Sequence, residues 1–68
     1  MPDLTATEIN VLQMIVGGMV DKEIAFALDI TENTVRTHVK NIFDKIGVSD
    51  RTSAATLAIK RGLVRIDI

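Results

Sequence analysis

The 68 residues, 47% of them hydrophobic and 25% charged, are typical of a single globular domain, which we expect to span residues 1–68 with its core at 4–64. No cysteine, one histidine and 3% aromatic residues exclude disulfides, thiolate or multi-histidine metal sites and the base-stacking platforms of single-strand binders. The net charge of −1 and pI near 5.6 argue against a nucleic-acid binder, unless the charges are unevenly distributed.

The first predicted helix begins at Thr5, which forms a capping box with Glu8. Leu4 and Ile9 stand at the positions of a hydrophobic staple, and Gly17-Gly18 ends the helix. Apolar residues recur at helical spacing, which predicts core material without chemistry: Ile9, Val11, Leu12, Ile15, Val16 and Met19. The uncharged run from Ile9 to Val20 is too short and mixed to span a bilayer, and no basic signal-peptide region precedes it. We therefore expect a cytoplasmic protein with no membrane partner.

A short second helix is predicted at about Lys22 to Leu28, with Asp21 as its N-cap. Its inner face carries Ile24, Ala25 and Leu28, and the small Ala25 permits close approach of another helix. Asp29, Ile30 and Thr31 form the turn that follows. Asp tolerates left-handed backbone angles, Ile30 supplies an apolar plug, and Thr31 caps the next helix.

The third predicted helix, Glu32 to Ile46, ends at Gly47 and is strongly two-sided. One narrow stripe faces inward: Val35, Val39, Ile42 and Ile46. The opposite face collects polar residues: Asn33, Arg36, Thr37, Lys40, Asn41 and Asp44. A solvated surface is the default reading of such a face. Here, however, the residue types donate to base edges and phosphates, and the acids Glu32 and Asp44 stand at the ends.

A fourth helix is predicted at about Arg51 to Arg61, capped by Asp50 or Ser49 and stopped by Gly62. This helix carries several small side chains: Ala54, Ala55 and Ala58. Leu57 and Ile59 cannot both point inward, which predicts a second face that is buried by a partner. Ala55 and Ile59, spaced i and i+4, are the candidate dimerisation residues.

A short helix, a tight turn and a longer helix together predict an all-α helix-turn-helix domain whose third helix enters a DNA major groove. The sequence also resembles a family, the LuxR/FixJ-type (GerE-like) helix-turn-helix. The resemblance covers residues 4–64 and is carried by the run DKEIAFALDITENTVRTHVKNIFDKIGV, by Leu4-Thr5 with Glu8 before it, and by Arg51, Ala54, Ala58 and Gly62-Leu63 after it. It departs from the family pattern at Ala6-Thr7, where a Pro-Arg pair is common, and at Val20, where a Ser cap is common.

The resemblance implies a four-helix domain that reads DNA with its third helix and forms homodimers on DNA through its fourth. Arg36, Thr37 and Lys40 match positions used toward bases, and the outer face adds Asn33 to them. Positions used toward phosphates or local structure match Lys22, Thr31, Thr34, His38 and Lys45, to which the same face adds Asn41. The implied partners are double-stranded DNA, a second copy of the chain, an N-terminal receiver domain and RNA polymerase. We expect no cofactor, metal or catalytic residue.

Two other readings stay open from the residues. A sigma-factor region-4-like domain also reads DNA with similar helices, although His38, Gly47-Val48 and the alanine-rich fourth helix favour the first reading. A helical protein-interaction module without DNA binding is the other alternative. An enzyme is disfavoured, because no nucleophile–base pair, metal cluster or phosphate-binding glycine loop is present. The sequence does not name the operator or the signal, and it fits either an output domain or a stand-alone regulator.

Overall fold

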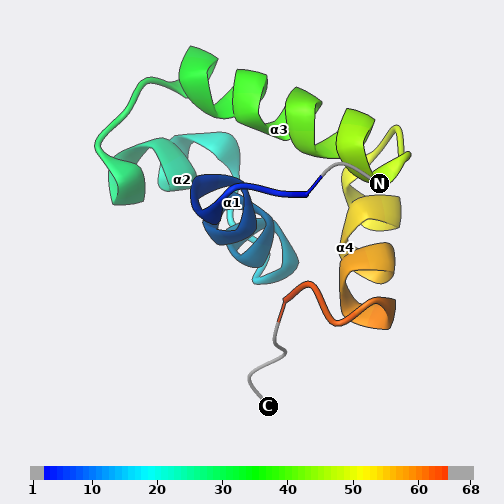
Figure 1. Ribbon diagram of the computed structural model, residues 1–68. Coiled ribbons are helices and arrows are strands. Elements are labelled where there is room, and N and C mark those ends of the chain that lie inside the picture. Colours follow the sequence, from blue (N-terminus) through cyan, green and yellow to red (C-terminus); the bar gives the residue numbers. More distant parts are fainter. Residues whose placement is uncertain (1–2, 65–68) are drawn as a thin grey trace.

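The computed structural model describes residues 3–64, so both ends of the predicted 1–68 domain lie outside the described part. Four helices and no strand make up this part: α1 (Ala6–Val16), α2 (Asp21–Leu28), α3 (Glu32–Ile46) and α4 (Arg51–Lys60) (Figure 1). The all-α, four-helix prediction is confirmed, with each helix within one residue of its predicted bounds. Between residues 3 and 64, no helix combines the length and apolar character needed to cross a membrane.

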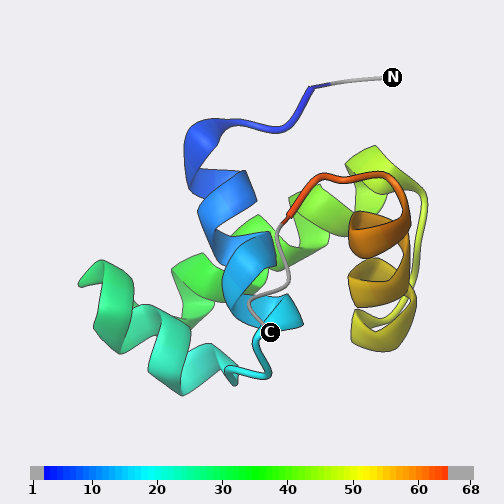
Figure 2. The same cartoon turned by 90° about the horizontal axis from the view of Figure 1, so that it is seen from below.

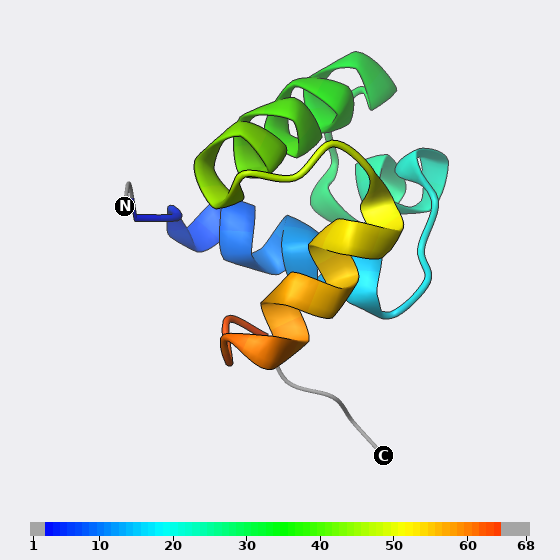
Figure 3. The same cartoon turned by 90° about the vertical axis from the view of Figure 1, so that its right-hand side faces the viewer.

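The three shorter helices support α3 from one side. α1 lies between α2 and α4, as the view from below shows (Figure 2). α3 lies across all three and packs against each of them (Figure 3). Within the described residues, no other helix covers the long outer side of α3 (Figures 1 and 3).

The core joins the inward faces of all four helices. Leu12, Ile24 and Ile42 are completely buried large side chains from three different helices. The other buried apolar residues are Val11, Ile15, Ala25, Val35, Val39, Ile46, Ala54 and Ala58. Ile9 was predicted within the buried stripe of the first helix, but it is 40% exposed. The buried face of α1 is turned toward Val11, Leu12 and Ile15 because α3 and α4 both pack there.

Three of the four helices begin with the predicted side-chain cap. In α1, the N–H of Thr5 donates to Glu8 Oε1 at 2.8 Å, and the N–H of Glu8 donates to Thr5 Oγ1 at 3.1 Å. Thr31 caps α3 by accepting from the N–H of Thr34. Asp50, rather than Ser49, caps α4 by accepting from the N–H of Ser53 at 2.7 Å, and this hydrogen bond lowers the pKa of the Asp50 carboxyl.

The N-cap of α2 differs from the prediction. Asp21 is the first helical residue, and Val20, which has no side-chain acceptor, occupies the cap. Glu23 compensates in part, because its Oε1 accepts from the N–H of Val20 at 3.0 Å. Asp21 lies one residue too late to be the cap, and its carboxylate binds Arg51 of α4 instead.

The turn between α2 and α3 fixes their crossing. Asp29 adopts the predicted left-handed conformation, with φ of 57°. The N–H of Ile30 then returns to the carbonyl of Ala25 at 3.0 Å, and the Ile30 side chain packs on the core. Ala25 is only 6% exposed, so its small side chain lies where the two helices meet.

Candidate nucleic-acid interface

The uncovered side of α3 brings together the side chains predicted to contact bases. Asn33, Arg36, Thr37 and Lys40 are all exposed there, and Asn41 lies on the same helix one residue beyond Lys40. The buried stripe of Val35, Val39, Ile42 and Ile46 fixes the orientation of this face, because turning the helix would expose four apolar residues.

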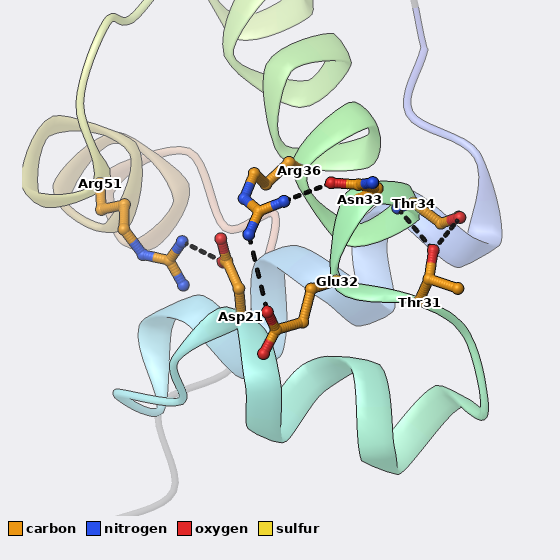
Figure 4. Close-up of polar contacts among 7 residues, drawn as sticks. All are labelled: Asp21, Thr31, Glu32, Asn33, Thr34, Arg36 and Arg51. Atoms are coloured by element: carbon orange, nitrogen blue, oxygen red, sulfur yellow. Dashed lines mark hydrogen bonds and ion pairs between the residues drawn. The ribbon is translucent and has the colours of Figure 1, made fainter.

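A hydrogen-bonded cluster occupies the first turns of this face (Figure 4). Arg36 donates through Nη1 to Asn33 Oδ1, and its Nη2 lies 3.6 Å from Glu32 Oε2. Thr37 donates through Oγ1 to the backbone carbonyl of Asn33 at 3.1 Å. Lys40, by contrast, makes no hydrogen bond or ion pair with any residue of the described part, so its ammonium is free to take an external acceptor.

The two predicted threonines at the start of α3 bind each other. Their hydroxyl oxygens are 2.9 Å apart, and Thr31 Oγ1 also accepts from the N–H of Thr34 (Figure 4). Both side chains are exposed. Thr31 caps the helix, and Thr34 supplies the N–H that it accepts. The pair places two exposed hydroxyl groups at the N-terminal, positive end of the helix dipole.

Two further predicted phosphate residues lie at the margins of this face. Lys22 is exposed on the first turn of α2 and lines a hollow of about 370 Å³ together with Glu32 and Arg51. His38 is half-buried on the flank of α3. Neither side chain has a partner between residues 3 and 64.

A second hollow, of about 370 Å³, lies beside α3 near its middle. Arg36, Lys40 and Asp44 line it from α3, and Val48 and Ser49 line it from the loop before α4. Asp21 also borders it, so the start of α2 adjoins both hollows. The lysine and arginine therefore stand at the rim of a concave surface between three segments.

Lys45 lies apart from the other predicted phosphate residues. Its Nζ is 2.6 Å from Glu8 Oε1, and it lies 3.5 Å from the backbone carbonyl oxygen of Asp3. Glu8 is only 5% exposed. The hydrogen bond from Lys45, followed by that from the Thr5 N–H, lowers the pKa of the Glu8 carboxyl. Lys45 thus joins α3 to the start of α1, which favours local structure over a phosphate role.

Arg51 makes a contact that sequence reasoning missed. Its Nη1 is 2.6 Å from Asp21 Oδ1, and its Nη2 donates to the carbonyl of Met19 at 2.9 Å (Figure 4). Arg51 had been noted only as a residue that matches the family. The pairing spans 30 residues, and no periodicity reveals a contact at that separation. It fixes the start of α2, and with it Lys22, against α4.

A family model also matches this chain, in agreement with the helix order, the left-handed turn and the exposed outer face of α3. The model described as "Bacterial regulatory proteins, luxR family" matches residues 2–58. The chain belongs to the LuxR family. The resemblance stated from the motifs is confirmed, and the match favours it over the sigma-factor alternative.

Several bacterial regulators are similar in sequence to this LuxR-family chain. The transcriptional regulatory protein YdfI of Bacillus subtilis is 41% identical over 64 residues, covering 94% of this chain and 30% of YdfI. The response regulator protein VraR of Staphylococcus aureus is 44% identical over 62 residues, covering 91% of this chain and 30% of VraR. The LuxR-family chain therefore spans about 30% of the length of these relatives.

Two solved structures resemble the fold closely. The transcription factor GerE superposes with a TM-score of 0.86 at 36% identity, covering 94% of this chain and 96% of GerE. The response regulator ChrA of a heme-sensing two-component system gives a TM-score of 0.88 at 40% identity, covering 93% of this chain and 31% of ChrA. The four-helix LuxR-family fold is thus found both as most of one chain and as part of a longer one.

Proposed function

We propose that this chain is a sequence-specific double-stranded DNA-binding domain of a bacterial transcriptional regulator, the output domain of a two-component response regulator. The observation that carries the proposal is the outer face of α3, where side chains that donate to base edges gather and which no other helix between residues 3 and 64 covers. An α-helix fits the major groove, in which each base pair presents its own donors and acceptors. LuxR-family membership supports the same assignment.

The proposed roles follow the position of each side chain on α3 and beside it. Those on the outer face take bases: Asn33, Arg36, Thr37 and Lys40. Those at its margins take phosphates: Lys22, Thr31, Thr34, His38 and Asn41. We leave Lys45 out of the interface, because its ammonium is bound to the buried Glu8.

The response-regulator context rests on the relatives. VraR and ChrA are named response regulators, and the chain matches about 30% of the length of each. We infer that the domain acts with a receiver domain on its N-terminal side, in the cytoplasm, and that it acts on RNA polymerase once it is bound to DNA. An N-terminal receiver domain would deliver the signal that this domain converts into promoter occupancy.

Selection of bound sequences from a random double-stranded DNA pool tests the proposal. We expect one motif to be enriched and to bind at least about 1,000-fold more tightly than unrelated DNA at physiological salt. The variant Lys40→Ala serves as a control, because it should weaken the enrichment while leaving the helical circular dichroism unchanged. If no motif is enriched and the protein does not bind DNA at physiological salt, the result favours the alternative, a helical protein-interaction module without DNA binding.

We further propose that the domain forms a dimer on DNA through α4. Ala54 and Ala58 are buried in the core, whereas Ile59 is 40% exposed and Ala55 is half-buried beside it. The patch is too small to hold a free dimer, since stable interfaces bury about 1,200–2,000 Å². We therefore expect a monomer in dilute solution and a dimer on two half-sites about one helical turn apart.

Glutamate at Ala55 or Ile59 is expected to abolish cooperative binding to paired half-sites while leaving binding to a single half-site unchanged. A dimer of the variant would bring two glutamates together in a contact that excludes water, and this costs free energy. Gel-shift titrations on single and paired sites measure the difference. Thr56→Glu, an exposed position on α4 outside this patch, is the matched control. Undiminished cooperativity in the Ala55→Glu/Ile59→Glu double variant would rule out this dimer interface.

A further inference from the structure

Arg36 is already engaged by its own helix in the absence of DNA. Its guanidinium meets the amide oxygen of Asn33 through one nitrogen and the Glu32 carboxylate through another (Figure 4). Both partners lie one turn toward the N-terminus, the direction in which long helical side chains lean. A base edge that takes the Nη1 and Nη2 fork of Arg36 therefore competes with two existing interactions.

We infer that Glu32 is a specificity-determining residue that acts through Arg36, restricting it to guanine. The inference rests on the proposed function, that α3 reads DNA bases. Guanine presents two acceptors, N7 and O6, in the major groove and can satisfy the guanidinium fork at once. Adenine and thymine present one acceptor each and cytosine presents a donor, so at those bases at most one hydrogen bond replaces both the Asn33 hydrogen bond and the Glu32 ion pair of Arg36.

The charge of Glu32 also acts against the other acceptor available to Arg36, a phosphate oxygen. A phosphate could satisfy the fork as well as guanine does, but its negative charge would lie beside the Glu32 carboxylate. The Glu32 side chain is 45% exposed, so it stays charged at the protein surface where the DNA would dock. Repulsion therefore penalises a swing of Arg36 to the backbone more than it penalises binding to an uncharged base edge.

Asp21 borders the same hollow as Arg36 but does not share this role. Its carboxylate is bound to Arg51 at 2.6 Å, and the same arginine is anchored to the Met19 carbonyl. Figure 4 shows the two ion pairs side by side, one from α4 to α2 and the other within α3. Arg51 thus occupies Asp21 and leaves Glu32 as the carboxylate that holds Arg36.

The test compares the affinity for the selected motif with the affinity for unrelated DNA in wild type and in Glu32→Gln. Glutamine keeps the shape and one acceptor of glutamate and removes its charge. We expect Glu32→Gln to bind unrelated DNA more tightly and to lower the ratio of the two affinities by about threefold, since an exposed ion pair is worth a factor of about 1.5 to 5. In an Arg36→Ala background the same substitution should leave the ratio unchanged.

Asp44→Asn is the matched control, because Asp44 is an exposed acid at the other end of the same helix and has no partner between residues 3 and 64. If Glu32→Gln strengthens binding to both DNAs by the same factor, as Asp44→Asn should, the inference is overturned and the proposed function stands. If Glu32→Gln still changes base preference without Arg36, Glu32 contacts a base itself, which also overturns the inference. If the wild-type protein prefers no motif, both the proposed function and the inference are wrong.

Discussion

Replacing Lys45 with methionine is expected to lower the free energy of unfolding by about 2 kcal/mol. Glu8 is 5% exposed and would be left as a buried carboxylate without its ammonium partner. Loss of one member of a buried ion pair costs about 3–5 kcal/mol, and the 27% exposure of the Lys45 side chain reduces this figure. Glu8 also keeps its hydrogen bond from Thr5. Urea unfolding followed by circular dichroism measures the change.

The pH dependence of the same variant identifies the cause. Lys45 lowers the pKa of Glu8 in the folded state, so the pair stabilises the fold above the ordinary carboxyl pKa of about 4.3. This stability is lost as the pH falls through the lowered folded-state pKa, because Glu8 then becomes protonated. The difference between wild type and Lys45→Met should therefore be largest near about pH 7 and narrow toward about pH 3.

A double variant, Glu8→Gln with Lys45→Met, is the control, since glutamine removes the buried charge but keeps an acceptor for the Thr5 N–H. Its stability should lie close to that of wild type. If Lys45→Met leaves stability unchanged and instead weakens DNA binding with a smaller salt slope, Lys45 belongs to the phosphate interface and its structural assignment here is wrong.

The fold could be predicted from the sequence because its local signals agree with one another. Thr5 and Glu8, Thr31, Asp50 and Gly47 mark helix ends by chemistry that acts within a few residues, and each lies at a helix end in the structure. The single long apolar stripe of α3 fixed its inward face in the same way. Ile9 was misplaced because α1 carries apolar residues on more than one side, so spacing alone did not show which side α3 and α4 would cover.

The candidate site was predicted as a set of positions but not as a set of contacts. Which side chains share the outer face of α3 follows from the helical repeat. The ion pairs of Lys45 and Arg51 do not, because each joins residues far apart in sequence whose meeting depends on how the helices cross. The predicted cap of α2 was wrong by one residue, because Val20 is the last extended residue and Asp21 is already helical.

Lys40→Ala is expected to flatten the preference of the domain at one or two base positions, with a loss of about 1–3 kcal/mol of discrimination there. Lys40 is exposed on the outer face of α3 and has no partner between residues 3 and 64, so no internal contact must be broken before it donates to guanine O6 or N7. Arg36, held by Glu32 and Asn33, should show a smaller loss on substitution by alanine, because part of its binding energy replaces those contacts.

Lys22→Ala is the matched comparison, because Lys22 is also exposed and also has no partner between residues 3 and 64, but lies on the first turn of α2. From that helix it can reach only the sugar-phosphate backbone when α3 occupies the major groove. A lysine at a helix start opposes the helix dipole, so a phosphate partner gives it a role that stability does not. Its loss should weaken binding to all sequences alike and reduce the magnitude of the salt slope by about 1.

Binding profiles over a randomised operator at several salt concentrations separate the two lysines. The assignment fails if Lys22→Ala alters base preference while Lys40→Ala leaves it intact.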